Sequence, residues 1–139
     1  MHLRPPNQMH LRMPSEEFLA SNVELLQDWI VEIADGANPQ SVVDKLNDCT
    51  FEMWLPYDGD RFVGMVITYK APNRPCLEFL GAAGDVMNNY EGLHNSFVAL
   101  ARDRGCTSYE FKGRRGFLRA FKKFGMTERY TVMECRFED

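Results

Sequence analysis

The stretch FLGAAGDVMNNYEGLHNSF, from Phe79 to Phe97, has the residue types and spacing of a phosphate-binding turn. A short apolar run ends in small residues, an Asp- and Asn-rich turn follows, and helical spacing of apolar residues begins near Asn88. The backbone N–H groups and dipole at the start of such a helix favour a negatively charged group. Asp85 and Glu91 oppose this, because like charges about 4 Å apart repel by roughly 1 to 4 kcal/mol. The stretch therefore has the outline of an anion site with unfavourable side chains.

A second chemically distinctive segment is a run of basic residues near the C-terminal end: Lys112, Arg114, Arg115, Arg119, Lys122 and Lys123. Two interpretations remain open for this run. It is a patch for a phosphate or an acidic partner, or it is the solvated outer face of a short helix. The net charge of the whole chain is -4, so a nucleic-acid partner is not expected.

Histidines and cysteines do not form a metal-binding pattern. No two of the four cysteines have C-x-x-C spacing, and no histidine stands beside one: Cys49, Cys76, Cys106 and Cys135. We expect these four to be reduced thiols used as small core residues, which indicates a reducing compartment. No metal is therefore predicted.

Length and composition favour one packed domain. The chain has 139 residues, of which 45% are hydrophobic and 12% aromatic. It has no apolar run of the roughly 20 residues that a membrane span needs. The N-terminal MHLRPPNQMHLRMP lacks the apolar core of a signal peptide, so secretion is not expected. We expect residues 1–8 to form an N-terminal arm and residues 9–139 to form the domain.

Periodicity predicts elements in the order β-α-α-β-β-β-α-β-α-β. Hairpin meanders come first, and strands alternate with helices later, which is typical of a mixed sheet with helices on both faces. The expected elements are a strand at Met9–Met13, helices from Ser15 to Gly36 and from Pro39 to Asn47, a hairpin over Cys49–Lys70 turning at Asp58-Gly59, a strand at Cys76–Ala83, a helix from Asn88 to Arg104, a strand at Cys106–Phe111, a short helix at Arg115–Phe124 and a strand at Thr127–Phe137.

This order, with three local motifs, resembles the GNAT family of acyl-CoA-dependent N-acetyltransferases. The motifs are YDGDRFVGMVITY at Tyr57–Tyr69, CLEFLGAAGDVMNNYEGLHNSFVALARDRG at Cys76–Gly105, and RGFLRAFKKFGM at Arg115–Met126. The resemblance implies a single α/β (α+β) GNAT-like domain with a mixed, mostly antiparallel central sheet. It also implies acetyl-CoA as the cofactor of an active member.

The resemblance assigns the cofactor site to two segments. The pantetheine arm would lie along the splayed strand through main-chain hydrogen bonds of Phe79, Leu80 and Gly81. The pyrophosphate would sit on the turn that contains Asn89, Tyr90, Gly92 and Leu93, with Arg114 nearby. Gly92 fits the first glycine of the family's turn. Asn89 stands where Arg or Gln is usual, and His94 stands where a small residue is usual.

The resemblance to the GNAT family also implies roles for catalytic residues. Glu78 matches the strand carboxylate that removes the amine proton, often through water; its alternative is an ordinary solvent-facing strand residue. Phe121 stands at the position of the family's tyrosine acid and has no proton to give. Some family members manage without that tyrosine.

Two functional readings follow from these departures. The first is a GNAT fold that has lost catalysis and serves as a binding or structural component, since the chain is similar to degenerate GNAT-like proteins of tailed bacteriophages, including internal virion proteins. Protein partners, virion proteins or self-assembly, would then be expected, in the cytoplasm or inside a virus particle. The alternative is an active N-acetyltransferase that works by direct attack of an amine on acetyl-CoA.

Overall fold

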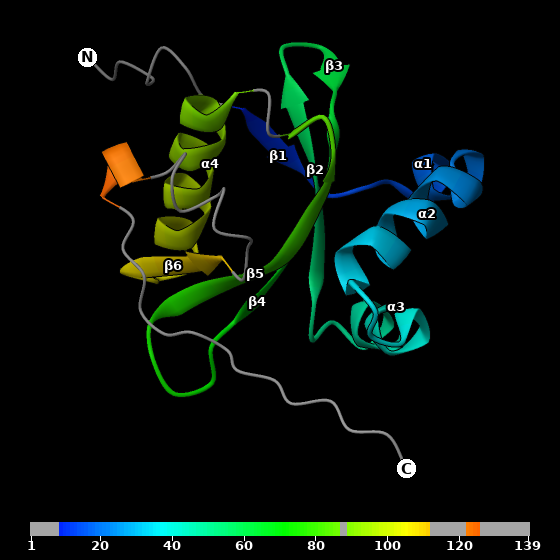
Figure 1. Ribbon diagram of the computed structural model, residues 1–139, viewed down its shortest axis with the longest axis horizontal. Coiled ribbons are helices and arrows are strands. Elements are labelled where there is room, and N and C mark those ends of the chain that lie inside the picture. Colours follow the sequence, from blue (N-terminus) through cyan, green and yellow to red (C-terminus); the bar gives the residue numbers. More distant parts are fainter. Residues whose placement is uncertain (1–8, 87–88, 112–121, 126–139) are drawn as a thin grey trace, which may run out of the picture.

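The computed structural model describes residues 9–86, 89–111 and 122–125, and a six-stranded sheet runs through them (Figure 1). The strands are β1 (His10–Arg12), β2 (Glu52–Asp58), β3 (Arg61–Phe62), β4 (Gly64–Lys70), β5 (Cys76–Gly84) and β6 (Ser108–Phe111). Their order is β1-β2-β4-β5-β6, and β3 pairs with β2 off this path. Only the β5–β6 pair is parallel among these strands. The prediction of a mixed, mostly antiparallel sheet in an α+β domain is confirmed.

The predicted hairpin is present in three pieces. Gly59 has φ +65° in the turn between β2 and β3, where Asp58 and Arg61 are register partners. β3 is short, and the chain then continues into β4, which pairs with β2 further along. The N–H of Val63, between β3 and β4, donates to the carbonyl of Pro56 at 2.9 Å, so the break between these two strands is hydrogen-bonded.

Helices cover both faces of the sheet. α1 (Glu16–Ser21), α2 (Val23–Ala34) and α3 (Pro39–Asn47) lie on one face, and α4 (Tyr90–Asp103) lies on the other (Figure 1). Ser15 caps α1 by accepting from the N–H of Phe18, and Asn38 caps α3 before the proline at its first position. The single helix expected from Ser15 to Gly36 is divided at Asn22, whose φ of -130° is not helical and whose side-chain amide donates to the carbonyl of Phe18.

Alternating strand residues divide the core into two clusters. The α4 side buries Leu77, Phe79, Leu93 and Phe97, together with Val66. The opposite side buries residues of α2 with the alternate positions of β2 and β4, among them Leu26, Ile30, Ile33, Leu55, Met65 and Ile67. This period-two segregation fixes which strand side chains face α4 and which face α2 and α3.

The cysteines follow the prediction in part. Cys76 and Cys106 are free and buried, at 1% and 4% exposure. The prediction was wrong for Cys49, which is an exposed free thiol with φ +66° just after α3. A residue in the left-handed region at the end of a helix turns the chain out of the helix, and here it leaves the side chain in solvent.

Several predictions fall outside the described residues. These are the N-terminal arm at 1–8, the candidate ligand Arg114, the Phe121 position, the last strand at Thr127–Phe137 with Cys135 in it, and Lys112, Arg115 and Arg119 of the basic run. Of the expected helix at Arg115–Phe124, the structure describes a 3-10 turn, η2 (Lys122–Phe124), followed by Gly125. None of the described helices has the length and apolar character to cross a membrane.

Candidate functional site

The parallel pairing of β5 with β6 covers only the first part of β5. Cys76 pairs with Ser108, and the register continues to Phe79 opposite Phe111, where β6 ends. From Gly81 to Gly84, β5 pairs with β4 on one edge alone within the described part of the chain. A strand edge of this kind presents N–H and C=O groups to an extended ligand.

A β-bulge lies where this one-sided segment begins. Thr68 of β4 pairs with Phe79, whereas Ile67 pairs with Gly81, so Leu80 is the extra residue. Leu80 and Gly81 both approach the α2 side of the sheet: Leu80 packs against that cluster, and a Cβ on Gly81 would lie 3.0 Å from the Ile33 side chain. Bulges bend a strand and re-aim its edge. The bulge therefore turns the second half of β5 at the point where its pairing with β6 stops.

Gly84 ends β5 and directs the chain toward α4. Its φ is +83°, a conformation that favours glycine, and its ideal Cβ would lie 2.8 Å from the Cα of Gly64 on β4. Asp85 follows, and its N–H donates to the carbonyl of Val63 at 2.7 Å. The carboxylate of Asp85 also lies 3.8 Å from the guanidinium of Arg61, with both side chains exposed. A cation that the sequence did not single out is thus close to the predicted anion turn.

The start of α4 carries its own cap. The side-chain oxygen of Asn89 accepts from the N–H of Gly92 at 3.0 Å, and the N–H of Leu93 donates to the carbonyl of Asn89. Tyr90 and Glu91 form the exposed first turn, whereas Gly92 and Leu93 are buried. The candidate cofactor residues of the turn are therefore adjacent, and one of their backbone amides, that of Gly92, already donates to the Asn89 side chain.

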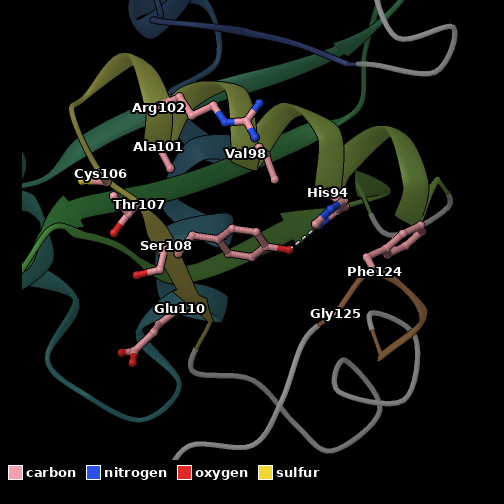
Figure 2. A pocket seen from close by; sticks show the side chains of 11 residues that line it. His94, Val98, Ala101, Arg102, Cys106, Thr107, Ser108, Glu110, Phe124 and Gly125 are labelled. Carbon is pink, nitrogen blue, oxygen red and sulfur yellow. Dashed lines mark hydrogen bonds between the residues drawn. The ribbon is translucent and has the colours of Figure 1, made fainter.

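His94 points toward β6. Its Nδ1 lies 2.7 Å from the hydroxyl of Tyr109, and its ring stacks on Phe124 at a centroid distance of 4.7 Å (Figure 2). Burial lowers the pKa of His94 and raises the pKa of Tyr109, so the imidazole is neutral and the phenol stays protonated at pH 7. The imidazole of His94 and the phenol of Tyr109 therefore form a hydrogen bond between two neutral groups. The sequence had placed His94 where a small residue is usual beside the phosphate.

This pair borders an open pocket of about 800 Å³ between α4, β6 and the residues of η2. Figure 2 shows Val98 and Arg102 of α4 on one side and Ser108 and Glu110 of β6 on another. The remaining lining residues are Ala101, Cys106, Thr107, Tyr109, His94, Phe124 and Gly125. Polar and apolar groups share the lining, so an amphipathic ligand fits it better than a purely apolar one.

Glu78 is half-buried and paired with Arg74. The Nη2 atom of Arg74 lies 3.2 Å from Oε1 of Glu78 and 2.5 Å from Oε2 of Glu110. Glu110 holds the pKa of Arg74 above its ordinary value. Glu78 and Glu110 are register partners in the parallel pair. Because their neighbours Leu77, Phe79, Tyr109 and Phe111 pack on the α4 side, strand alternation directs the two side chains to the opposite face of the sheet.

Sequence reasoning singled out Glu78 but did not relate it to Arg74 or Glu110. Arg74 stands in the loop APNRP, and no local pattern relates it to Glu110, 36 residues later. Only the register of the parallel β5–β6 pair brings the three side chains together. Among the described residues, no group of three His, Cys, Asp or Glu side chains is arranged to hold a metal ion.

No protein-family model and no curated protein matches this sequence. Solved structures do match it. An acetyltransferase from Trypanosoma brucei is 14% identical with a TM-score of 0.59, covering 94% of this chain and 100% of that chain. A predicted acetyltransferase from Clostridium acetobutylicum, solved with acetyl-CoA, is 11% identical with a TM-score of 0.60, covering 93% of this chain and 96% of that chain.

A GNAT family acetyltransferase from Staphylococcus aureus is 9% identical with a TM-score of 0.61, covering 94% of this chain and 99% of that chain. Identities this low show the fold alone. The predicted likeness to bacteriophage proteins gains no support from these comparisons. The chain has the fold of the GNAT acetyltransferases, as its element order and motifs predicted.

Proposed function

We propose that this chain binds acetyl-CoA along the second half of β5 and the start of α4, and transfers the acetyl group to an amine. The observation that carries the proposal is the end of the β5–β6 pairing at Phe79 and Phe111. It leaves the strand edge from Leu80 to Gly84, bent by a bulge, and α4 is the next helix along the chain. The likeness to structures named as acetyltransferases supports the same reading.

The strand edge fits an extended, amide-containing arm. Main-chain N–H and C=O groups of Leu80, Gly81 and Ala82 are the expected partners, because a strand edge binds an extended chain through its backbone. Gly81 and Ala82 are small and half-buried, which leaves room for close approach. The aromatic rings of Phe79, Phe97 and Phe111 pack together beneath this segment and give it a rigid support.

The backbone at the start of α4 favours a phosphate group, whereas some of its side chains oppose one. The N–H groups of the first turn and the helix dipole favour a negative charge. Asn89 already accepts from the N–H of Gly92, so a phosphate must displace this cap to use that donor. Asp85, just after β5, and Glu91, in the first turn of α4, are exposed acids, and Arg61 beside Asp85 offsets part of the charge of Asp85.

Glu78 is the proposed base. Bound acetyl-CoA would supply a thioester acetyl group as the electrophile. Glu78 stands two residues before the bulge, on the face of the sheet opposite α4, and its side chain is 14% exposed. Its carboxylate can accept a proton from an approaching amine, directly or through a water, which keeps the amine nitrogen nucleophilic.

The charge of the helical layer on that face favours a positively charged acceptor. Residues 13–47 contain one cation, Lys45 in the last turn of α3, and the acids Glu16, Glu17, Glu24, Asp28, Glu32, Asp35 and Asp44. All seven are exposed, and none forms an ion pair with a described residue. Such a field raises the local concentration of cations near the layer. A protonated amine is the form that an aliphatic amine takes at neutral pH.

The other reading, a non-catalytic component of a bacteriophage virion, rests on one specific observation. The Asn89 cap occupies a donor that a phosphate would need. The similarity to structures named as acetyltransferases favours the catalytic reading over it. Protein partners and a location in the cytoplasm or inside a virus particle stay predictions.

An acetyl-transfer assay tests the proposal. The purified protein is incubated with acetyl-CoA and a panel of amines (polyamines, aminoglycosides, lysine-containing peptides), and release of the free thiol is followed. We expect amine-dependent release that Glu78→Gln reduces at least tenfold while acetyl-CoA binding is retained. Binding of acetyl-CoA without any turnover by the wild type would favour the non-catalytic reading. Equal turnover by wild type and Glu78→Gln would reject Glu78 as the base.

A further inference from the structure

One guanidinium nitrogen in this protein contacts two carboxylates unequally. The Nη2 atom of Arg74 lies 2.5 Å from Glu110 and 3.2 Å from Glu78. A charge-assisted hydrogen bond strengthens as it shortens, so Glu110 has the stronger contact with the cation. The side chain of Glu110 is 17% exposed and that of Glu78 is 14% exposed, which limits the screening of these interactions by water.

The side chains of Arg74, Glu78 and Glu110 all project from backbone that is hydrogen-bonded within the sheet or to it. Glu78 and Glu110 are register partners on neighbouring parallel strands. The N–H of Cys76 donates to the carbonyl of Arg74 at 2.8 Å, and the N–H of Thr107 donates to the carbonyl of Pro75 at 2.9 Å. The loop that carries Arg74 is thus tied to the start of both β5 and β6. The unequal sharing is therefore a property of the sheet and not of a free surface side chain.

We propose that Glu110 is a positioning residue for Glu78: by binding Arg74 more closely, it leaves the Glu78 carboxylate able to accept the proton of the acceptor amine. This inference rests on the proposed function, in which Glu78 is the base. In that step one N–H bond of the amine breaks and one O–H bond forms on Glu78. Glu110 itself does not contact the substrate.

The physical basis is the opposing effect of the two neighbours on proton affinity. A carboxylate that pairs fully with Arg has a lowered pKa and is a weak base, whereas a nearby second carboxylate raises its pKa. Glu110 acts in the same direction twice, since it draws Arg74 away and adds negative charge. Two further described titratable groups lie at this position: Tyr69 of β4, the register partner of Glu78 on its other side, and Cys76, whose thiol interacts with Arg74.

Two variants move the balance in opposite directions. Glu110→Gln removes the competitor and leaves Arg74 to Glu78, so the proton affinity of Glu78 falls. Arg74→Gln removes the positive charge of Arg74 from beside the two carboxylates, so the proton affinity of Glu78 rises. We expect changes of about tenfold each way, equal to about one pH unit in the titration midpoint. Arg74→Lys retains the positive charge and is expected to stay near the wild type.

The test is a pH titration of side-chain carboxyl groups by carbon-13 NMR, which needs no turnover. Glu78→Gln identifies the Glu78 resonance by its disappearance. Glu52→Gln is the matched control, because Glu52 is also a half-buried glutamate paired with an arginine, Arg104, outside this cluster. We expect the Glu78 midpoint to be unchanged in that control. The acidic limb of the kcat/KM profile for acetyl transfer should move with the NMR midpoint.

The outcomes separate this inference from the proposed function. Opposite shifts in Glu110→Gln and Arg74→Gln, matched by the kinetic limb, support it. The positioning role of Glu110 would be overturned if the two variants shifted the Glu78 midpoint in the same direction or not at all. It would also be overturned if the rate fell at every pH while the acidic limb of the kcat/KM profile stayed in place. Glu110 would then have a structural role. Failure of the wild type to bind acetyl-CoA would reject the proposed function, whatever the carboxyl titrations show. Thermal unfolding of each variant verifies that it is folded.

Discussion

Replacing Asn89 with alanine should weaken the fold and strengthen acetyl-CoA binding by nearly the same free energy. The side-chain oxygen of Asn89 accepts from the N–H of Gly92 at 3.0 Å, in a half-buried position at the start of α4. Loss of such an N-cap lowers the free energy of unfolding by about 1 kcal/mol. The same hydrogen bond must break before a phosphate can use the Gly92 donor. Asn89→Ala lacks this hydrogen bond, so acetyl-CoA binding to the variant does not include the free energy of breaking it.

The expected gain follows from the cap energy. A free energy of about 1 kcal/mol corresponds to about a fivefold decrease in the dissociation constant. Asn89→Asp is the matched control, because it keeps the capping oxygen and adds a negative charge beside the phosphate. A like charge about 4 Å away costs roughly 1 kcal/mol or more at the surface, so this variant should bind several-fold more weakly than the wild type.

Isothermal titration with acetyl-CoA at low salt measures the affinities, and urea unfolding measures the stabilities. The two changes in Asn89→Ala must have opposite signs if the cap and the phosphate compete for one donor. An Asn89→Ala protein that binds acetyl-CoA more weakly than the wild type would refute this reasoning, because it would mean that the Asn89 side chain holds the ligand directly. An unchanged affinity would mean that the phosphate leaves the cap in place.

Two further predictions concern pH and charge. Burial lowers the pKa of His94 below its unfolded value near 6.5, so the unfolded chain binds more protons as the pH falls below that value and stability is lost there. Urea midpoints should therefore fall between pH 7 and pH 5 more steeply for the wild type than for His94→Gln, which stays neutral. Reversing charge on α2 with Glu24→Lys and Asp28→Lys should raise the KM for a cationic amine several-fold at low salt and less at high salt, with the affinity for acetyl-CoA little changed.

A specific result would contradict each of these two predictions. Parallel pH profiles for wild type and His94→Gln would show that His94 does not titrate differently in the two states. For the charge reversal, the matched control is Asp58→Lys with Asp60→Lys on the exposed turn between β2 and β3, which changes net charge equally. An equal rise in KM for both double variants would mean that total charge matters and the helical layer does not.

The order and type of elements could be predicted from the sequence because each has a clear local cause. The cap at Ser15, the proline after Asn38 and the Asp58-Gly59 turn all act within a few residues, and the structure has each of them. The break at Asn22 was missed, because apolar spacing continues through it. An Asn side chain that bonds back to the carbonyl four residues earlier gives no change of period.

The candidate site was less predictable, because its contacts are long-range. The Arg74–Glu110 pair and the His94–Tyr109 hydrogen bond join residues 36 and 15 positions apart. The first depends on the register of β6 against β5, and the second on the packing of α4 against β6, and no short motif specifies either. The acidic character of residues 13–44 was visible in the sequence, yet its meaning appears only when the helices are seen to share one face of the sheet (Figure 1).

The central claim is that acetyl-CoA binds the second half of β5 and the start of α4. A nitrogen-15 NMR titration of the labelled protein with acetyl-CoA tests it most directly, because each backbone amide reports separately. We predict the largest shift changes at Leu80, Gly81 and Ala82 and at Tyr90 to Gly92, with saturation at micromolar to millimolar ligand. Saturable changes confined to other segments, or none up to millimolar acetyl-CoA, would contradict the claim.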